Sequence, residues 1–523
     1  MRGRKRFIAF LCILVLMLGI SAAQAATILY VPQDDRPVSL DDVVDTAEAA
    51  KLTVLTPPPE MIASRDKKGD PEQLWTWVND HASFADALVL SGDALIYGGL
   101  VDSRTHAFDE KVLKERLERF KQLQKAHPFA RLYVYSTVLR TPQGTAGGVE
   151  PAYYEQYGWN IYQLTALRDK EEVEGLTKKE KKLLESNLAI IPPDALADWM
   201  QRRQKNFSIN SGLIELNRQG LLKFFLLGRD DTAPYSQSHK EGRELSAFAA
   251  DLPQSRFQTF PGADQLGMVL LARAYNDLNF RIPVIKVNYA SGAGKDSVPS
   301  YEDQKVGKSI VDHIVAAGGI VLNNPLKPDL IVNVNTPPTG KTPEAGSPKN
   351  TTALTPGLRH FIEGIEAQLE AGQQVAVADI SFANGADNAL MAELSRRNLL
   401  DKLSAYSGWN TAGNTMGYTV GQGMLSGAAD DKDRKRLLAV RYLDDWAYQA
   451  NIRQALAEEI IYPNKGSLVY LNEWRPQLTA EVQKRERQFA GQHLSWLPPD
   501  QVTVTFPWNR MFEVKVDIAP GQE

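Results

Sequence analysis

The chain has 523 residues, of which 43% are hydrophobic and 23% charged, and its formal net charge is −4. This composition is typical of a globular protein and excludes a disordered, fibrous or coiled-coil chain. The slightly acidic balance provides no basic face for a nucleic-acid partner. At about 150 residues per domain, the length predicts about three domains, or one large α/β unit with an appendage.

The first 25 residues are predicted to be a signal peptide. A basic start at residues 2–6 precedes the apolar run Phe7–Ile20, which is short for a membrane span, and an Ala-x-Ala cleavage site ends at Ala25. The single cysteine, Cys12, lies in this run, so the processed protein would have no disulfides. We therefore expect an exported protein, periplasmic or extracellular, without a stable membrane anchor; an uncleaved N-terminal anchor is the alternative.

Short aliphatic or β-branched runs alternate with stretches of helical periodicity from Thr27 onward, a pattern typical of βαβ units. The predicted strands are Ile28–Val31, Leu52–Leu55, Ala87–Leu90, Leu132–Ser136, Phe224–Leu227, Phe257–Phe260, Val284–Asn288, Ile320–Leu322, Leu330–Val334, Val375–Asp379 and Leu403–Tyr406. The predicted helices include Asp109–Ala126, Leu196–Gln219, Gln265–Leu278, Gln304–Ala317 and Leu358–Ala371.

This order predicts an α/β fold with mostly parallel sheets. Two Rossmann-like lobes, residues 26–278 and 279–425, fit the number of strands better than an elaborated (β/α) barrel, which remains the competing fold. Residues 426–523 are predicted to be a mostly helical C-terminal extension, with helices at Arg434–Ile461 and Leu478–Ala490 and closing strands at Val502–Phe506 and Phe512–Val516. The Pro- and Gly-rich stretch Thr336–Pro356 is predicted to be a surface loop.

Acidic residues follow many of the predicted strands, where parallel sheets and barrels bind their ligands. Asp264 and Asp387 also precede predicted helices, so helix capping is an equally good interpretation of both. Asp34 is followed by Asp35, and alternation along a strand lets only one of the two point into a given pocket. The candidate catalytic residues are Asp93, Asp230 and Asp387, followed by Asp34 and Asp264.

Paired carboxylates beside an aromatic plate are typical of glycosidic bond hydrolysis, which needs one protonated and one ionised carboxyl. Trp409 stands among small and polar residues, which favours a half-exposed plate for a sugar ring over a place in the core. The candidate substrate-binding residues are Arg36, Tyr97, Arg104, Arg140, Asp231, Asn384, Trp409, Asn410 and Asn414.

Several common site motifs are missing from the sequence. There is no His-x-His, His-Glu-x-x-His or Cys–His cluster for zinc, no Gly-x-Ser-x-Gly elbow, and no Gly-x-Gly-x-x-Gly after the first strand. A divalent cation on Asp34, Asp93 or Asp230 is an open alternative, because such ions prefer oxygen ligands. We expect neither a metal nor an organic cofactor.

A set of motifs resembles one known bacterial family, domain of unknown function 4127 (DUF4127). The resemblance covers most of the chain in order, and it implies family membership without an established reaction. Where the family more often has Glu, this chain has Gln265. The motifs are Asp34-Asp35-Arg36-Pro37, Tyr97-Gly98-Gly99-Leu100 with Ser103-Arg104, Gly262-Ala263-Asp264, Asn384-Gly385-Ala386-Asp387, Gly408-Trp409-Asn410-Thr411 with Asn414-Thr415, and Pro507-Trp508-Asn509-Arg510.

Two functions remain in competition. The first is a hydrolase acting on a carbohydrate or cell-envelope glycan. The second is an extracytoplasmic binding protein whose two lobes close on a sugar or another polar solute. Carboxyl groups that face each other across one pocket would favour hydrolysis, whereas scattered carboxyls in a hinged cleft would favour binding.

Overall fold

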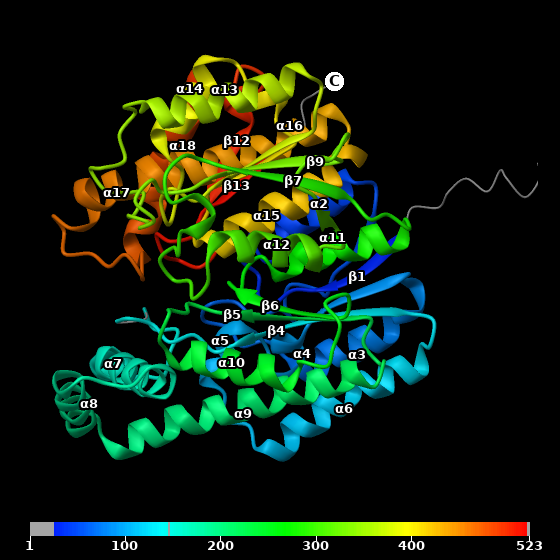
Figure 1. Cartoon of the computed structure of the whole chain (residues 1–523), viewed down its shortest axis with the longest axis vertical. Coiled ribbons are helices and arrows are strands. Elements are labelled where there is room, and N and C mark those ends of the chain that lie inside the picture. The colour runs from blue at the N-terminus through cyan, green and yellow to red at the C-terminus, as the bar shows by residue number, and fades with distance from the viewer. Residues whose placement is uncertain (1–25, 145–146, 520–523) are drawn as a thin grey trace, which may run out of the picture.

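The computed structural model describes residues 26–144 and 147–519 (Figure 1). The predicted signal peptide, residues 1–25, lies outside the described residues. The described chain forms two parallel sheets and one short antiparallel hairpin.

Sheet A is a six-stranded parallel sheet in the first lobe, with the order β2-β1-β3-β4-β5-β6. All residues of β3 and β5 are buried, because helices cover both faces of the sheet, and their sequences are accordingly almost continuously apolar. The strands are β1 (Thr27–Val31), β2 (Thr53–Leu55), β3 (Ala87–Ser91), β4 (Arg131–Val138), β5 (Phe224–Arg229) and β6 (Phe257–Pro261).

Sheet B is a five-stranded parallel sheet in the second lobe, with the order β11-β10-β9-β7-β8. Both sheets are thus open and doubly wound, with helices on the two faces of each. Neither sheet closes on itself within the described residues, so two Rossmann-like lobes are confirmed over a barrel. The strands are β7 (Val284–Tyr289), β8 (Ile320–Val321), β9 (Leu330–Asn335), β10 (Val375–Asp379) and β11 (Ala405–Ser407).

Helices and sheets alternate in layers (Figure 1). The outer layer on sheet A consists of α3 (Pro71–His81), α4 (Gly92–Tyr97), α5 (Leu100–Thr105), α6 (Glu110–Ala126), α9 (Pro193–Arg218) and α10 (Gln237–Phe248), and a helical hairpin, α7 (Tyr154–Val173) and α8 (Lys178–Ile190), projects beside it. The middle layer between the sheets consists of α2 (Asp41–Ala49), α11 (Leu266–Leu278), α12 (Val306–Ala316) and α15 (Ala412–Leu425).

The layer on the far side of sheet B contains α13, α14 and most of the C-terminal region, which is helical as predicted. The predicted single helix Arg434–Ile461 is instead interrupted by π-helical turns, which are wider than α-helical ones. The elements are α13 (Pro356–Glu370), α14 (Asn388–Arg396), α16 (Asp431–Arg441), π-helical η5 (Tyr442–Ile452), α17 (Arg453–Leu456), π-helical η6 (Ala457–Ile461), α18 (Arg475–His493), and the hairpin β12 (Val502–Thr505) with β13 (Lys515–Ile518).

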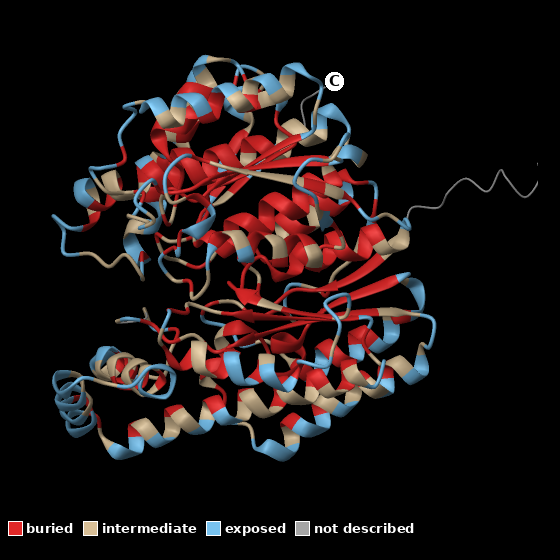
Figure 2. Cartoon of the chain, in the orientation of Figure 1, coloured by how far each residue is buried: buried red, intermediate tan, exposed pale blue. Residues whose placement is uncertain are grey.

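The two lobes share one hydrophobic core. Tyr30 and Val89 of sheet A belong to the same buried cluster as Val332 and Ala376 of sheet B, and the helices of the middle layer join them. Figure 2 shows this middle layer as buried almost throughout. Opening the lobes about a hinge would expose this apolar surface to water, so the structure favours a fixed relation between them.

Glycines allow the two central helices of this layer to approach closely. Gly413, Gly417 and Gly421 recur at four-residue spacing along α15, whose residues are all buried. A Cβ on Gly417 would lie 2.3 Å from Cγ of Gln265, and one on Gly421 would lie 2.5 Å from Cγ of Met268. Both contacts are closer than real Cβ atoms tolerate, so α11 packs on a surface that only glycine provides.

Gly417→Ala is expected to destabilise the protein by about 1–3 kcal/mol, because the added methyl overpacks the contact between α11 and α15. The measurement is urea unfolding. Gly364→Ala in α13 is the control, since nothing lies within 4 Å of the place that its added methyl would take; it should be neutral or stabilising by up to about 1 kcal/mol. Equal effects of the two changes would contradict the close packing inferred for α15.

Candidate functional site

A pocket of about 520 Å³ opens where the carboxyl ends of both sheets meet. This volume lies in the range of small-molecule sites, and the position is the one at which open parallel sheets bind ligands. Both sheets turn their carboxyl ends to the same side, so residues far apart in sequence line a single pocket. The predicted site residues that line it are Arg36, Arg104, Arg140, Asp230, Asp231, Asp264, Asn384, Asn410 and Asn414.

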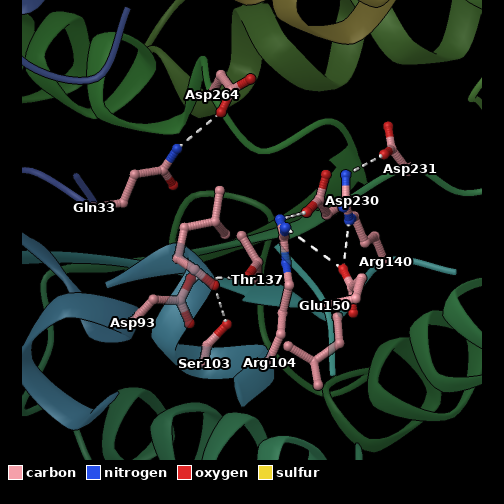
Figure 3. A network of polar contacts seen from close by, with 12 residues as sticks. Gln33, Asp93, Ser103, Arg104, Thr137, Arg140, Glu150, Asp230, Asp231 and Asp264 are labelled. Atoms are coloured by element: carbon pink, nitrogen blue, oxygen red, sulfur yellow. Dashed lines mark hydrogen bonds and ion pairs between the residues drawn. The ribbon is translucent and has the colours of Figure 1, made fainter. Parts of the chain in front are cut away.

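Asp230 follows β5 and belongs to a chain of ion pairs on one wall of the pocket (Figure 3). Arg104 donates to it at 2.6 Å and lies 3.6 Å from Glu150, which also accepts from Arg140 at 2.7 Å; Arg140 in turn donates to Asp231 at 3.2 Å. Burial raises the pKa of Asp230 to about 6, with the charge of Arg104 opposing the rise and that of Asp231 adding to it. Asp230 is therefore a carboxyl that can carry a proton near neutral pH.

Asp264 follows β6 and is held by side chains from both lobes. Gln33 and Arg36 of the first lobe donate to one carboxylate oxygen at 3.0 and 2.6 Å. Asn410 and Asn414 of the second lobe donate to the other oxygen at 3.3 and 3.5 Å. Four donors, one of them a guanidinium, thus hold both oxygens of this carboxylate in place.

Asp34 lies behind Arg36 and does not line the pocket. The Arg36 guanidinium donates to both oxygens of Asp34, at 2.8 to 3.1 Å. Because it also donates to Asp264, Arg36 bridges the two carboxylates. The neighbouring Asp35 takes a different partner, accepting from Nε1 of Trp508 at 2.7 Å. Burial raises the pKa of Asp35 to about 6. Asp34 is thus placed to orient Arg36, not to contact a ligand in this pocket.

Asp93 and Tyr97 are buried beneath the pocket and line no part of it. Asp93, in α4, accepts from the hydroxyls of Thr137 at 2.8 Å and Ser136 at 3.2 Å. Burial raises the pKa of Asp93 to about 7. Tyr97 stacks on His106 with ring centroids 4.9 Å apart. Both side chains thus lie in the interior, where the structure offers them no direct contact with a ligand in the pocket.

Asp387 caps a helix, so the capping interpretation is the one that the structure supports. It precedes α14, accepts from the amide of Ala389 at 2.9 Å, and also accepts from Asn335 at 3.1 Å. Burial raises its pKa. Asp264 behaves differently, because the N-cap of the following helix is Gln265 and the Asp264 carboxylate faces the pocket.

The prediction of Trp409 as a half-exposed plate is wrong. It is 4% exposed and packs in the shared core, with its ring centroid 5.9 Å from that of Phe512. The aromatic residues that line the pocket include Phe512 and Trp508. The Trp508 ring contacts the guanidinium groups of Arg36 and Arg510, which lie 5.1 and 4.8 Å from its centroid. Trp508 and Phe512 follow β12, which lies outside the two parallel sheets. A search of the ends of parallel strands therefore does not find them.

Residues with left-handed backbone conformations gather at this pocket. Asp231, Tyr301, Asn384 and Asn410 line it and have φ values of 32°, 67°, 59° and 65°. Such conformations cost free energy for residues other than glycine, and they concentrate at functional sites. Glu344, from the predicted surface loop, accepts from Tyr301 at 3.1 Å and from Asn384 at 2.7 Å. This loop therefore supports one wall of the pocket.

Two further properties concern the described parts of the chain. Across residues 26–144 and 147–519, no group of three or more His, Cys, Asp or Glu side chains is arranged to hold a metal ion. In the same ranges, no helix combines the length and apolar character needed to cross a bilayer.

The fold and site define a two-lobed α/β protein with a carboxylate- and arginine-lined pocket at its sheet ends. Residues 28–517 match the family described as "Protein of unknown function (DUF4127)", and the chain belongs to this family. No curated protein matches it. Among solved structures, a complex of a UDP-glucosyltransferase from Polygonum tinctorium capable of glucosylating indoxyl and 3,4-dichloroaniline aligns at 9% identity over 86% of this chain and 100% of that one, with a TM-score of 0.19; so low a score carries no argument.

The raised carboxyl pKa values predict that stability falls as pH rises from about 4 to 7. Between its unfolded value of 3.8 and its folded value of about 7, Asp93 binds more protons in the folded state, so the free energy of unfolding decreases with pH. Asp42 and Asp379, each with a pKa of about 7, act in the same direction. Asp93→Asn should make this slope shallower in thermal unfolding measured across that range.

Asp251→Asn is the control for this measurement. Asp251 is exposed, and its pKa is lowered by hydrogen bonds from Arg218, so it stays ionised over this pH range. Its variant should keep the wild-type slope. A slope that is the same in Asp93→Asn as in the wild type would contradict the protonation inferred for the buried Asp93.

Proposed function

We propose that this DUF4127 protein is a hydrolase that cleaves a glycosidic bond in a carbohydrate or cell-envelope glycan. The observation that carries the proposal is a pair of carboxyls in one pocket with opposite environments. Asp230 is largely buried, with its pKa raised to about 6, whereas Asp264 accepts from four side-chain donors. Two carboxyls in environments of different polarity and charge can serve as acid and base in one reaction.

Asp230 is the general acid in this proposal. Its pKa of about 6 leaves a useful protonated fraction near neutral pH, so it can protonate the leaving oxygen as the glycosidic bond breaks. Arg104, at 2.6 Å, holds the carboxyl in place and stabilises the carboxylate that remains after proton transfer.

Asp264 is the ionised partner, acting either on the anomeric carbon or on the attacking water. The two routes require carboxyl separations of about 5–5.5 Å and about 6.5–9.5 Å respectively, and they give opposite stereochemistry. Its donors come from both lobes, which fixes the orientation of the carboxylate. Preorganisation of this kind removes the free-energy cost of arranging the group during the reaction.

The remaining pocket residues suit a neutral, hydroxyl-rich ligand. Asn384 and Asn410 offer amide donors and acceptors, while Asp231 and Arg140 offer a partly exposed ion pair. Phe512 supplies an aromatic surface for the apolar face of a sugar. The other predicted site residues act in this proposal only by supporting the surrounding structure: Asp34, Asp93, Tyr97, Asp387 and Trp409.

Binding without catalysis is the second candidate function. Its sequence-based form assumes two lobes that close about a hinge, and the shared core of the lobes works against such a motion. A rigid pocket can still bind a solute. Hydrolysis is favoured because Asp230 and Asp264 have different environments, and the raised pKa of Asp230 provides an acid. Binding of a solute does not require an acid.

Export is part of the proposal. A signal peptide at residues 1–25 would place the protein in the periplasm or outside the cell, where envelope glycans are found. The proposed chemistry uses carboxyl groups alone, so neither a metal nor an organic cofactor takes part.

Asp230→Asn and Asp264→Asn are each expected to lower kcat about 10²- to 10⁴-fold, because each removes a proton-transfer or nucleophilic group. The measurement is turnover of a substrate found by screening bacterial and plant glycans with the wild-type protein. Asp251→Asn, at an exposed position that does not line the pocket, should keep full activity. Undiminished turnover in both pocket variants would refute the assigned roles.

The pH profile of kcat/KM provides an independent test. Activity should decline above about pH 6 as Asp230 loses its proton. Because the charge of Arg104 lowers the pKa of Asp230, Arg104→Gln should move this alkaline limb to higher pH. An alkaline limb that stays in place in this variant would show that Asp230 is not the acid.

A further inference from the structure

Large apolar side chains are exposed on the edge of the protein opposite the pocket. Phe129, Phe280 and Ile282 are 96%, 89% and 68% exposed. They stand just before β4 and β7, at the amino ends of the parallel strands. More exposed apolar residues lie in the segments that lead into other strands or within the short strand β8: Phe84, Phe248, Ile320, Leu322 and Leu326.

The topology places these segments on one side of the molecule. All strands within each sheet are parallel, and the carboxyl ends of both sheets line the same pocket, so the amino ends of both sheets share the opposite face. We name this the amino-end face. Exposed apolar side chains also occur elsewhere, for example Leu183, Leu188 and Ile190 on α8. Phe129, Phe280 and Ile282, however, line one groove together, and such a cluster is typical of an interaction surface.

Basic side chains accompany the apolar ones. A groove of about 580 Å³ is lined by Phe129, Phe280 and Ile282 together with Arg131, Lys223 and Arg281. The Arg131 guanidinium lies 5.9 Å from the ring centroid of Phe280. Phenylalanine beside lysine and arginine is the combination found where proteins enter the headgroup region of an anionic bilayer.

Two acidic residues at this edge are turned to the backbone. Asp86 accepts from the amide of Thr27 at 2.8 Å, and Asp329 accepts from the amide of Val284 at 2.7 Å. Their carboxylates are thus engaged at strand starts. A third acidic residue, Asp277, lines the groove itself, and its carboxylate is engaged by Arg273 at 3.1 Å and by the hydroxyl of Tyr133 at 2.9 Å. These contacts leave Lys223 and Arg281 to meet an anionic surface.

The start of the described chain lies at the same face. β1 begins at Thr27, at the amino edge of sheet A, and it directly follows residues 1–25, with their basic start and the apolar run Phe7–Ile20. Because the signal peptide proposed for residues 1–25 would be removed, this face has to bind a bilayer through its own side chains.

We propose that the amino-end face rests on an anionic lipid bilayer. Phe129, Phe280 and Ile282 enter the headgroup region, and Lys223 and Arg281 pair with lipid phosphates. The pocket then opens away from the bilayer. This inference concerns a surface distinct from the pocket and stands independently of the proposed hydrolysis.

The test measures which part of the full chain enters the bilayer. In a Cys12→Ser background, Phe280→Cys and Phe129→Cys carry an environment-sensitive fluorophore, and the vesicles contain phosphatidylcholine and phosphatidylglycerol with brominated acyl chains. Fluorophores at positions 129 and 280 should be quenched. The matched control is Trp159→Cys, an exposed aromatic position on α7 outside the amino-end face, and it should not be quenched.

A second measurement separates this face from residues 1–25. Lys223→Glu with Arg281→Glu should weaken binding to phosphatidylglycerol vesicles about tenfold or more, since each basic residue near an anionic surface contributes about 1 kcal/mol. Unchanged urea unfolding shows that the variant is folded. Absent quenching at positions 129 and 280, equal quenching at 159, or self-association of the lipid-free protein through this face would each overturn the proposal.

Discussion

The close contact between α11 and α15 is the constraint on which the rest of the structure depends. Helix α11 ends the first lobe and α15 belongs to the second, so their packing joins the two sheets through one core. The contact requires the glycines at positions 413, 417 and 421, because a side chain there would collide with the partner helix or the segment before it. The two lobes consequently behave as a single body.

The packing of α11 against α15 also determines the geometry of the pocket. Asp264 directly precedes Gln265, the N-cap of α11, and Asn410 and Asn414 flank the start of α15. Packing the two helices together therefore brings the carboxylate to its donors. Gln33 and Arg36 complete the arrangement from the end of β1. Stability and site chemistry thus rest on the same helix pair, since a shift of α15 would remove two donors from Asp264.

Local patterns in the sequence predict the sheets well and the site only in part. Every strand from β1 to β11 is predicted, because buried parallel strands are short apolar runs between amphipathic helices. The rule that ligands meet strand ends finds Asp230 and Asp264. Periodicity cannot identify Glu150 or Phe512, which reach the site through long-range packing, nor the burial of Trp409, which depends on Phe512 from a distant segment. The glycine spacing in α15 is a visible signal of close helix packing.

A single body formed from two lobes has a consequence for how a ligand is selected. The pocket walls cannot adjust by domain closure, so the pocket keeps a fixed width when a ligand binds. A ligand enters and leaves by diffusion through an entrance that stays open. Discrimination between ligands then rests on their size and on the placement of their polar groups. Entry and release would proceed without waiting for a conformational change of the whole molecule.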